Sequence, residues 1–162
     1  MDNLKLRKIK KSDLALFLKW WKDKDLIALT SGNFDEPNEN LPKYFAKMLK
    51  DEKNHHYIIR VENKTIGHLA LIHKTANLFE LTVIIGEKNY WGKGFGTKAI
   101  KKALSLGFNR FGYSKACLEV RPENIRAIEA YKNCGFAEKG LKKRPENKNQ
   151  PVVLKMVLNK NN

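Results

Sequence analysis

Residues 81–100 read LTVIIGEKNYWGKGFGTKAI, and this stretch decides the fold. Its first part closes an apolar, β-branched run over 78–85, which predicts a strand ending at Gly86. Three glycines then alternate within Gly92-Lys93-Gly94-Phe95-Gly96, and helical spacing of apolar residues begins after them. Because glycine has no Cβ, its backbone N–H groups can approach an anion, and a helix start adds further N–H donors. The stretch predicts a strand–turn–helix unit whose turn is either a pyrophosphate cradle or a plain flexible connection.

Two common phosphate-binding motifs are excluded at this turn. The dinucleotide fingerprint requires G-x-G-x-x-G, whereas the glycines here are spaced G-x-G-x-G. A P-loop requires Gly-Lys followed by Ser or Thr, and Gly96-Thr97-Lys98 has these residue types in another order. A nucleotide cradle of either kind is therefore not predicted.

Periodicity outward from the turn predicts one α/β domain over residues 1–162. Strands are predicted at 4–9, 56–61, 65–72, 78–85, 115–120, 136–140 and 152–158. Helices are predicted at 14–21, 41–49, 100–111 and 124–134, with Ser12 or Asp13 capping the first, Asn124 capping the last and Gly135 ending it. Hairpins and crossover helices both occur in this order, which is typical of a mixed sheet.

The composition excludes several classes of protein. With 42% hydrophobic and 10% aromatic residues, the chain is not a disordered polybasic tail, and no apolar stretch approaches the ~18 residues of a membrane span. Two cysteines, Cys117 and Cys134, exclude a disulfide scaffold and are expected to be reduced and structural. The four histidines show no ligand spacing, so no metal is expected. We expect a cytoplasmic protein, because residues 1–21 contain no apolar signal-peptide core.

The charge is strongly basic, with 32 Lys+Arg against 17 Asp+Glu and a net charge of +15. Residues 1–81 hold 15 basic and 11 acidic residues, giving +4, whereas residues 82–162 hold 17 and 6, giving +11. An anionic partner is therefore expected to bind the second half. Nucleic acid, an anionic lipid surface and a phosphate-bearing cofactor all fit, and a lysine-rich coding bias would produce the same excess.

A second group of polar residues lies at the end of the 115–120 strand and on the helix after it. Asn124 heads the helix and Tyr131 follows seven residues later, so both can face the same side. A neutral tyrosine suits the donation of a proton to a departing thiolate. Glu119 on the preceding strand can accept a proton from an amine, directly or through water. Taken singly, these residues would also fit an N-cap, a core aromatic and a solvated carboxylate.

The order of strand, glycine turn, helix, strand, Asn, Tyr and Gly-Phe resembles the GNAT superfamily of acetyl-CoA-dependent N-acetyltransferases over nearly the whole chain. The acyl-CoA signature of that family, R/Q-x-x-G-x-G/A, maps onto residues 91–96, with Trp91 in place of Arg or Gln. Residues 90–94 are similar to the branch that includes ribosomal-protein N-terminal acetyltransferases and many antibiotic and small-amine acetyltransferases. The resemblance implies a central, mixed, mostly antiparallel sheet flanked by about four helices.

The resemblance also implies acetyl-CoA as co-substrate and a set of residues that bind it. These are strand residues along the pantetheine arm, the turn, and two residues of the last helix: Val83, Ile84, Ile85, Trp91, Gly92, Lys93, Gly94, Phe95, Gly96, Thr97, Asn124 and Tyr131. Tyr131 corresponds to the family's general acid. Members of the family place the base where this chain has either Glu119 or Glu80. Glu119 is preferred for its fixed spacing from Tyr131, while Glu80 interrupts an apolar run with a charge that must face water or substrate.

The implied acceptor is a primary amine of a small molecule or of a protein N-terminus. In the family, the segment joining the first two helices shapes the acceptor site, which here is the acidic stretch 23–39. Trp20, Trp21 and Phe34 are expected to form its walls, with Glu80 as a further substrate contact. An acidic lining suits a cation such as a polyamine, an aminoglycoside or a peptide amine. We expect a monomer or homodimer with no membrane partner.

Two other functions fit the sequence. A basic RNA- or ribosome-binding module would use the positive second half, although no K homology loop, RNA-recognition motif or zinc knuckle occurs. A non-catalytic acyl-CoA sensor would keep the glycine turn, but it would not need both Glu119 and Tyr131. The presence of both residues favours an enzyme.

Overall fold

The computed structural model describes residues 3–29, 40–146 and 151–161. Their strands form one sheet of seven in the order β1-β2-β3-β4-β5-β7-β6. The strands are β1 (Leu4–Lys8), β2 (His55–Val61), β3 (Lys64–Thr75), β4 (Leu78–Ile85), β5 (Lys115–Val120), β6 (Ala137–Lys143) and β7 (Val152–Asn159). Each predicted strand is confirmed. Among these strands only β4 and β5 pair in parallel, so the mixed, mostly antiparallel sheet is confirmed as well.

Five α-helices accompany the sheet in the described residues, one more than predicted. They are α1 (Leu14–Trp21), α2 (Lys24–Leu29), α3 (Leu41–Lys50), α4 (Phe95–Ser105) and α5 (Ile125–Asn133). The unpredicted helix is α2, which is six residues long and lies in the acidic stretch. The carboxylate of Asp23 starts it by accepting the N–H groups of Asp25 and Leu26 at 3.1 and 3.2 Å. So short a helix shows no apolar repeat, and periodicity could not detect it.

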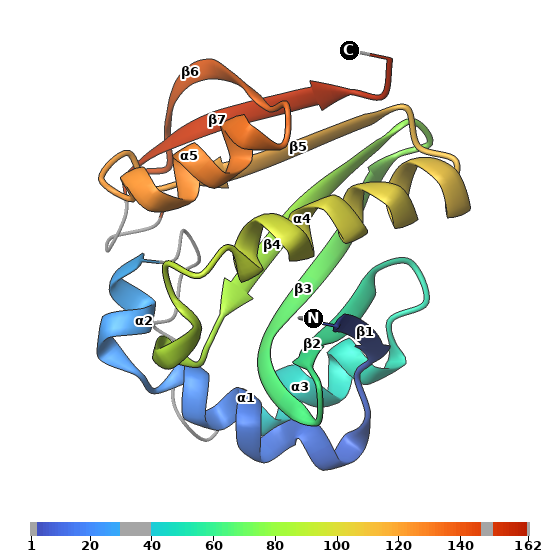
Figure 1. Cartoon of the computed structure of the whole chain (residues 1–162), viewed down its shortest axis with the longest axis vertical. Helices are drawn as coiled ribbons and strands as arrows, with labels where there is room; N and C mark the ends of the chain where they lie inside the picture. Colours follow the sequence, from blue (N-terminus) through green and yellow to red (C-terminus); the bar gives the residue numbers. More distant parts are fainter. Residues whose placement is uncertain (1–2, 30–39, 147–150, 162) are drawn as a thin grey trace.

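Helices cover both faces of the sheet. α4 and α5 lie over one face, and their apolar side chains join those of the strands in the larger of two core clusters (Figure 1). α1, α2 and α3 contribute to a smaller cluster on the other face. Successive side chains of a strand point to opposite faces of the sheet. In β2, Ile58 belongs to the smaller cluster and the next residue, Ile59, to the larger, and both are fully buried. The sheet therefore divides the core in two.

The first helix begins differently from its prediction. A 3-10 turn at Lys11–Asp13 precedes α1, so Asp13 occupies the predicted N-cap position but makes no side-chain capping hydrogen bond to α1. Its buried carboxylate accepts two hydrogen bonds from the guanidinium of Arg7, each 2.9 Å long. The backbone N–H of Lys10 donates a third at 2.8 Å. Asp13 thus joins β1 to the start of α1.

Asp13→Ala is expected to lower the free energy of unfolding by about 2 kcal/mol at pH 7, because buried hydrogen bonds to a charged group are lost. Burial alone would raise the pKa of Asp13, but the hydrogen bonds from Arg7 and Lys10 outweigh it and lower the pKa. A carboxylate with a lowered folded pKa stabilises the protein above its unfolded pKa, and this stabilisation is lost as pH falls through the folded value. Urea titrations from pH 7 to pH 2 should show the difference from wild type shrinking.

The matched control is Asp25→Ala, because the Asp25 side chain is 78% exposed and pairs with Lys88 at the surface. It should leave the unfolding midpoint nearly unchanged. A loss for Asp13→Ala that is the same at every pH would contradict the assigned role of the ionised carboxylate.

The sheet opens between β4 and β5. Their parallel ladder has three residue pairs, from Leu78↔Lys115 to Glu80↔Cys117. Beyond these pairs β4 continues along β3 and β5 continues along β7, so the two strands diverge toward their carboxyl ends (Figure 1). The edge of β4 after Glu80 therefore faces a wedge instead of another described strand. This wedge positions the site.

Candidate active site

A cleft of about 610 Å³ occupies the wedge between β4 and β5. Its lining comes from β4, the turn before α4, the end of β5 and the inner side of α5, with contributions from α2 and α3. Most site residues expected from the sequence line it, namely Glu80, Val83, Ile84, Ile85, Trp91, Gly92, Gly94, Phe95, Gly96, Thr97, Glu119, Asn124 and Tyr131. The two groups singled out in the sequence therefore meet in one cavity.

The glycine turn is shaped to receive an anion. Gly92 and Gly94 have φ angles of +71° and +79°, in the left-handed region that favours glycine. Apart from chain neighbours, no described atom lies within 4 Å of where a Cβ on either residue would be, so the space beside the turn is open. α4 begins at Phe95, directly after Gly94, and brings its unpaired N–H groups and positive dipole end to the turn. These features fit a diphosphate.

The open edge of β4 presents backbone groups to the cleft. The indole N–H of Trp91 donates to the carbonyl oxygen of Ile85 at 2.7 Å, so the backbone of Ile85 faces the wedge. Backbone groups alternate in direction along a strand, and those of Val83 therefore point the same way. An extended chain carrying amide groups, such as pantetheine, could pair with this edge as a strand would.

Tyr131 brings a buried phenol to the cleft. The residue is 8% exposed and packs edge-on against Phe136, with ring centroids 5.7 Å apart. Its hydroxyl makes no hydrogen bond to any part of the chain that the structure describes. Burial, with a contribution from Cys134, raises the pKa of Tyr131 to about 12. The hydroxyl is therefore neutral at physiological pH and available to donate to a ligand.

Asn124 joins the two sides of the cleft. Its side-chain oxygen accepts the N–H of Ala127 at 3.3 Å, which confirms the predicted N-cap of α5. Its amide N–H donates to the carbonyl oxygen of Leu29 at 3.1 Å, at the end of α2. The residue thus has a structural role at the cleft besides the cofactor contact expected from the sequence.

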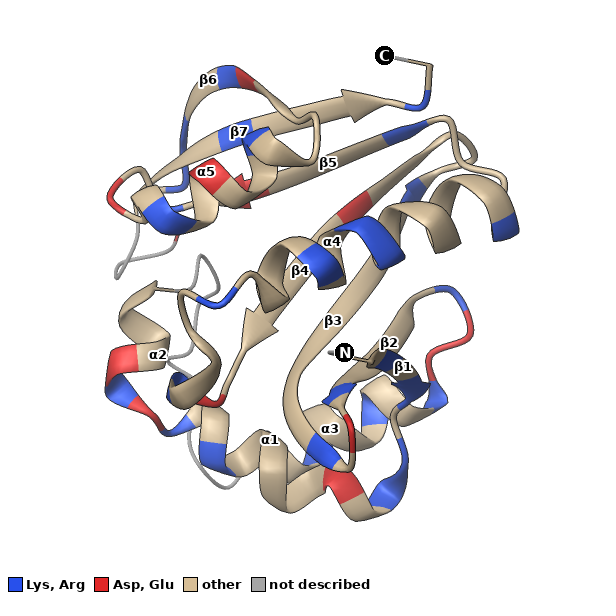
Figure 2. Ribbon diagram, viewed as in Figure 1, with Lys and Arg blue, Asp and Glu red and all other residues tan. Residues whose placement is uncertain are grey.

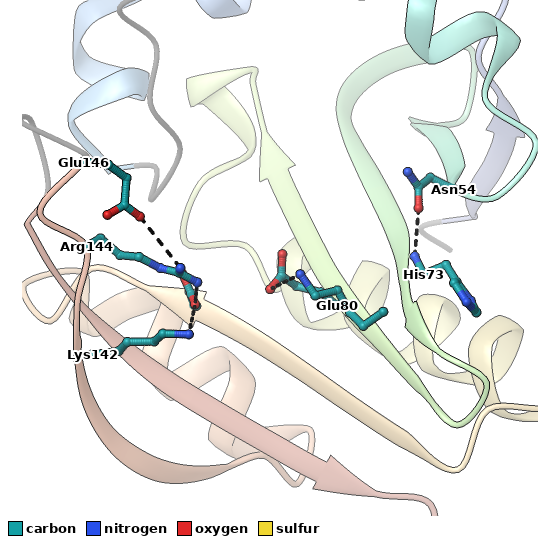
Figure 3. A network of polar contacts seen from close by, with 8 residues as sticks. Asn54, His73, Glu80, Lys142, Arg144 and Glu146 are labelled. Atoms are coloured by element: carbon teal, nitrogen blue, oxygen red, sulfur yellow. Dashed lines mark hydrogen bonds and ion pairs between the residues drawn. The ribbon is translucent and has the colours of Figure 1, made fainter.

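Glu119 is held in an ion pair at the end of β5. Arg144 donates to both carboxylate oxygens, from Nε to Oε2 at 3.2 Å and from Nη2 to Oε1 (Figure 3). The Nζ of Lys142 lies 3.9 Å from Oε1, and Arg144 is also 3.8 Å from a carboxylate oxygen of Glu146. Proton acceptance by Glu119 would have to compete with this two-point pairing.

Glu80 lies at the closed end of the wedge, where the ladder between β4 and β5 stops. Its side chain is 28% exposed, and Nζ of Lys74 lies 3.9 Å from its carboxylate, beyond hydrogen-bond distance. Figure 3 shows Glu80 on β4, facing the opening across which Arg144 and Lys142 lie. The Glu80 carboxylate is therefore more accessible to an approaching amine than the paired carboxylate of Glu119.

The walls at the α2 end of the cleft differ from those expected. The structure places Trp20 and Trp21 outside the cleft, where both line a separate cavity of about 20 Å³ and Trp21 packs edge-on against Tyr44. Leu26, Leu29 and Tyr44 line the cleft instead. Phe34 lies outside the described residues. The i, i+3 spacing of the two leucines was the only signal that could have indicated this wall from the sequence.

Acidic residues of the 23–39 stretch that the structure describes do not line the cleft. Asp23 and Asp25 both pair with Nζ of Lys88, at 3.1 and 2.7 Å. Lys93 also lies outside the lining, although its neighbours in the turn belong to it. The carboxylates that line the cleft, among the described residues, are therefore Glu80 on β4, Glu119 on β5 and Glu129 on α5.

The remaining charge and polar groups fit this picture. Figure 2 shows Lys and Arg on α4, β6 and β7, the half of the chain expected to meet an anion.

Burial raises the pKa of both cysteines, Cys117 and Cys134, so both thiols stay protonated, as a structural role requires. Within residues 3–29, 40–146 and 151–161, no group of three or more His, Cys, Asp or Glu could hold a metal ion. No helix in these ranges combines the length and apolarity needed to cross a bilayer.

Comparison with known proteins shows what the sequence of this chain is similar to. Residues 3–137 match the model of the acetyltransferase (GNAT) domain. The spermidine N(1)-acetyltransferase of Vibrio cholerae is 29% identical over 148 residues, which cover 86% of this chain and 82% of the relative. An aminoglycoside N(6')-acetyltransferase type 1 of Klebsiella pneumoniae is 23% identical over 159 residues, covering 90% and 79%.

The fold is also that of solved structures. The crystal structure of spermidine N-acetyltransferase from Vibrio cholerae in complex with CoA and spermine superposes with a TM-score of 0.86 at 23% identity. The match covers 98% of this chain and 96% of that one. The shared fold includes the sheet that frames the cleft.

Proposed function

Because this chain belongs to the acetyltransferase (GNAT) family, we propose that it transfers an acetyl group from acetyl-CoA to a primary amine of a small, cationic acceptor, with Glu80 as base and Tyr131 as acid. It is an N-acetyltransferase, and acetyl-CoA is its co-substrate. The observation that carries the proposal is the single cleft in which an anion-binding turn, an unpaired phenol and an accessible carboxylate meet.

Different features of the cleft would bind the different sections of acetyl-CoA. The amides of Gly92–Gly96 and the start of α4 would hold the diphosphate, and the edge of β4 would pair with the pantetheine arm. A backbone N–H on that edge, such as that of Val83, would stabilise negative charge on the thioester oxygen as the amine attacks. The hydroxyl of Tyr131 would donate its proton to the departing thiolate, which otherwise leaves as a charged group.

The acceptor amine must lose a proton, because an alkylamine is mostly protonated at neutral pH. Glu80 is the better placed base, since it lies at the apex of the wedge and no described residue pairs with it within hydrogen-bond distance. Glu119 keeps the spacing from Tyr131 that favoured it in the sequence, but Arg144 occupies both of its oxygens. If Glu119 were the base, the ion pair between Arg144 and Glu119 would have to open in each catalytic cycle.

The acceptor is proposed to be a small cationic amine. Spermidine and aminoglycosides are acceptors named for relatives of this chain, and both carry several ammonium groups. Three carboxylates, Glu80, Glu119 and Glu129, line the cleft, and its volume of about 610 Å³ would accommodate a small molecule beside the pantetheine arm.

The test is release of CoA thiol from acetyl-CoA in the presence of a panel of amines. Spermidine, an aminoglycoside, an alkylamine and a peptide with a free N-terminus form the panel, and product masses identify the acetylated group. We expect turnover with the polycationic amines and weak turnover with the alkylamine. Binding of CoA without turnover of any amine would favour the sensor, and tight RNA binding without CoA binding would favour the RNA module.

Arg144→Ala is expected to lower the KM for spermidine by about five-fold, because it removes the guanidinium that competes with a second ammonium group for the Glu119 carboxylate, an effect of about 1 kcal/mol. The KM for a simple alkylamine, which has one cation, should stay nearly constant. Arg144→Lys is the matched control, since it retains the positive charge beside Glu119. Equal effects on both amines would contradict a direct competition between Arg144 and the acceptor.

A further inference from the structure

The acyl-CoA signature of this chain lacks its usual polar side chain, because Trp91 occupies the position of Arg or Gln. A cation nevertheless lies at that position. The guanidinium carbon of Arg126, from the first turn of α5, is 4.3 Å from the centroid of the Trp91 ring. Both side chains line the cleft.

Trp91 is a fixed support for this cation. Its indole N–H donates to the carbonyl oxygen of Ile85 at 2.7 Å, which holds the ring against the end of β4. The ring also packs against the smaller core cluster. An Arg stacked on such a ring keeps its orientation at low entropic cost.

The charge of Arg126 is not neutralised by a carboxylate in the described part of the chain. Other cations of the chain pair closely with acids, for example Lys88 with Asp23 and Arg144 with Glu119. In the described part of the chain, Arg126 contacts the Trp91 ring and no carboxylate. A guanidinium stacked through its face keeps its N–H groups, which lie in its plane, available to bind an anion in two places at once.

We propose that Arg126, supported by Trp91, binds the diphosphate of acetyl-CoA from the α5 side of the cleft, and so supplies the charge that the signature position lacks. The proposal rests on the acetyl-CoA-dependent function argued above. The diphosphate is the expected ligand group because Trp91 directly precedes Gly92, the first residue of the anion-binding turn. The anion is then held between backbone amides of the turn and a side chain of another helix.

Arg126→Ala is expected to weaken CoA binding by about 10- to 50-fold in calorimetry, the usual range for losing a charged hydrogen-bonded pair. Arg126→Lys should retain part of the affinity, since a lysine carries the charge but neither stacks nor binds two oxygens in parallel. Arg121→Ala is the matched control, because Arg121 lies on the loop before α5 and does not line the cleft. The affinity of the Arg121→Ala variant for CoA should equal that of the wild-type protein.

Two further measurements separate a phosphate contact from a general disturbance. With S-acetylpantetheine, which has no phosphate, the kcat/KM of Arg126→Ala should equal that of wild type. With dephospho-CoA, which keeps the diphosphate but lacks the 3'-phosphate, the defect should persist in full. A defect that disappears with dephospho-CoA, or one that is equally large with S-acetylpantetheine, would overturn the assignment.

A charge-relocation variant tests the compensation directly. Trp91→Arg combined with Arg126→Ala should recover much of the CoA affinity that Arg126→Ala loses, because an arginine then stands at the signature position itself. Wild-type affinity in Arg126→Ala would refute this inference and leave the proposed function intact. Absence of CoA binding by the wild-type protein would instead refute the proposed function.

Discussion

Replacing Tyr131 with Phe is expected to lower kcat by about 100-fold or more, because a general acid commonly contributes 10²- to 10⁴-fold. The variant removes one oxygen from a buried side chain that has no described hydrogen-bond partner, so folding should be preserved. Stopped assays of CoA thiol release measure the effect, and calorimetry should show nearly unchanged binding of CoA. The Tyr131→Phe variant should therefore lose turnover while its affinity for CoA is preserved.

The pH dependence follows from the burial of Tyr131, which raises its pKa to about 12. The neutral, proton-donating form is present below that value, so loss of this acid should not limit the wild-type rate up to about pH 10. Tyr57→Phe is the matched control, because Tyr57 is also a buried tyrosine but lies outside the cleft. Turnover by Tyr131→Phe within a few-fold of that control would exclude Tyr131 as the acid.

Glu80→Gln is expected to lower kcat/KM by about 100-fold at pH 7, because the variant keeps the shape of the side chain but cannot accept a proton. The defect should shrink as pH rises, since a growing fraction of the acceptor amine is then already unprotonated. Glu119→Gln is the comparison variant, and we expect it to act mainly on the KM for polycationic acceptors. A large, pH-dependent loss in Glu119→Gln with little change in Glu80→Gln would reverse the two roles.

Much of the architecture could be predicted from local patterns. The hairpin of β2 and β3, the exact span of β4 and the N-cap at Asn124 all follow from alternation, turn composition and capping preferences. The glycine turn was also evident, because its unusual spacing lies between a strand and a helix. These features depend on residues close together in the chain.

The parts that could not be predicted depend on distant contacts. Arg144 lies 25 residues from Glu119, and no local pattern indicates that the two pair. The stacking of Arg126 on Trp91 joins the turn before α4 to the first turn of α5, which are distant in the sequence. The apolar spacing that ends at Trp21 correctly predicted a helix. Tertiary packing nevertheless places the Trp21 ring outside the cleft, and Tyr44 lines the cleft instead. Side-chain orientation at a site therefore needed the assembled fold.

The three-pair ladder between β4 and β5 has a mechanical consequence for turnover. Glu80 lies on β4, before this ladder in the chain, and Tyr131 lies on α5, after it, so the proposed base and the proposed acid are carried by different segments of the sheet and its helices. Apolar side chains of α4 and α5 share one core with those of β4 and β5 and so hold the two segments together. If the proposed roles hold, substitutions in this core that touch no reacting group should still change the rate, because they alter the alignment of the proposed base with the proposed acid.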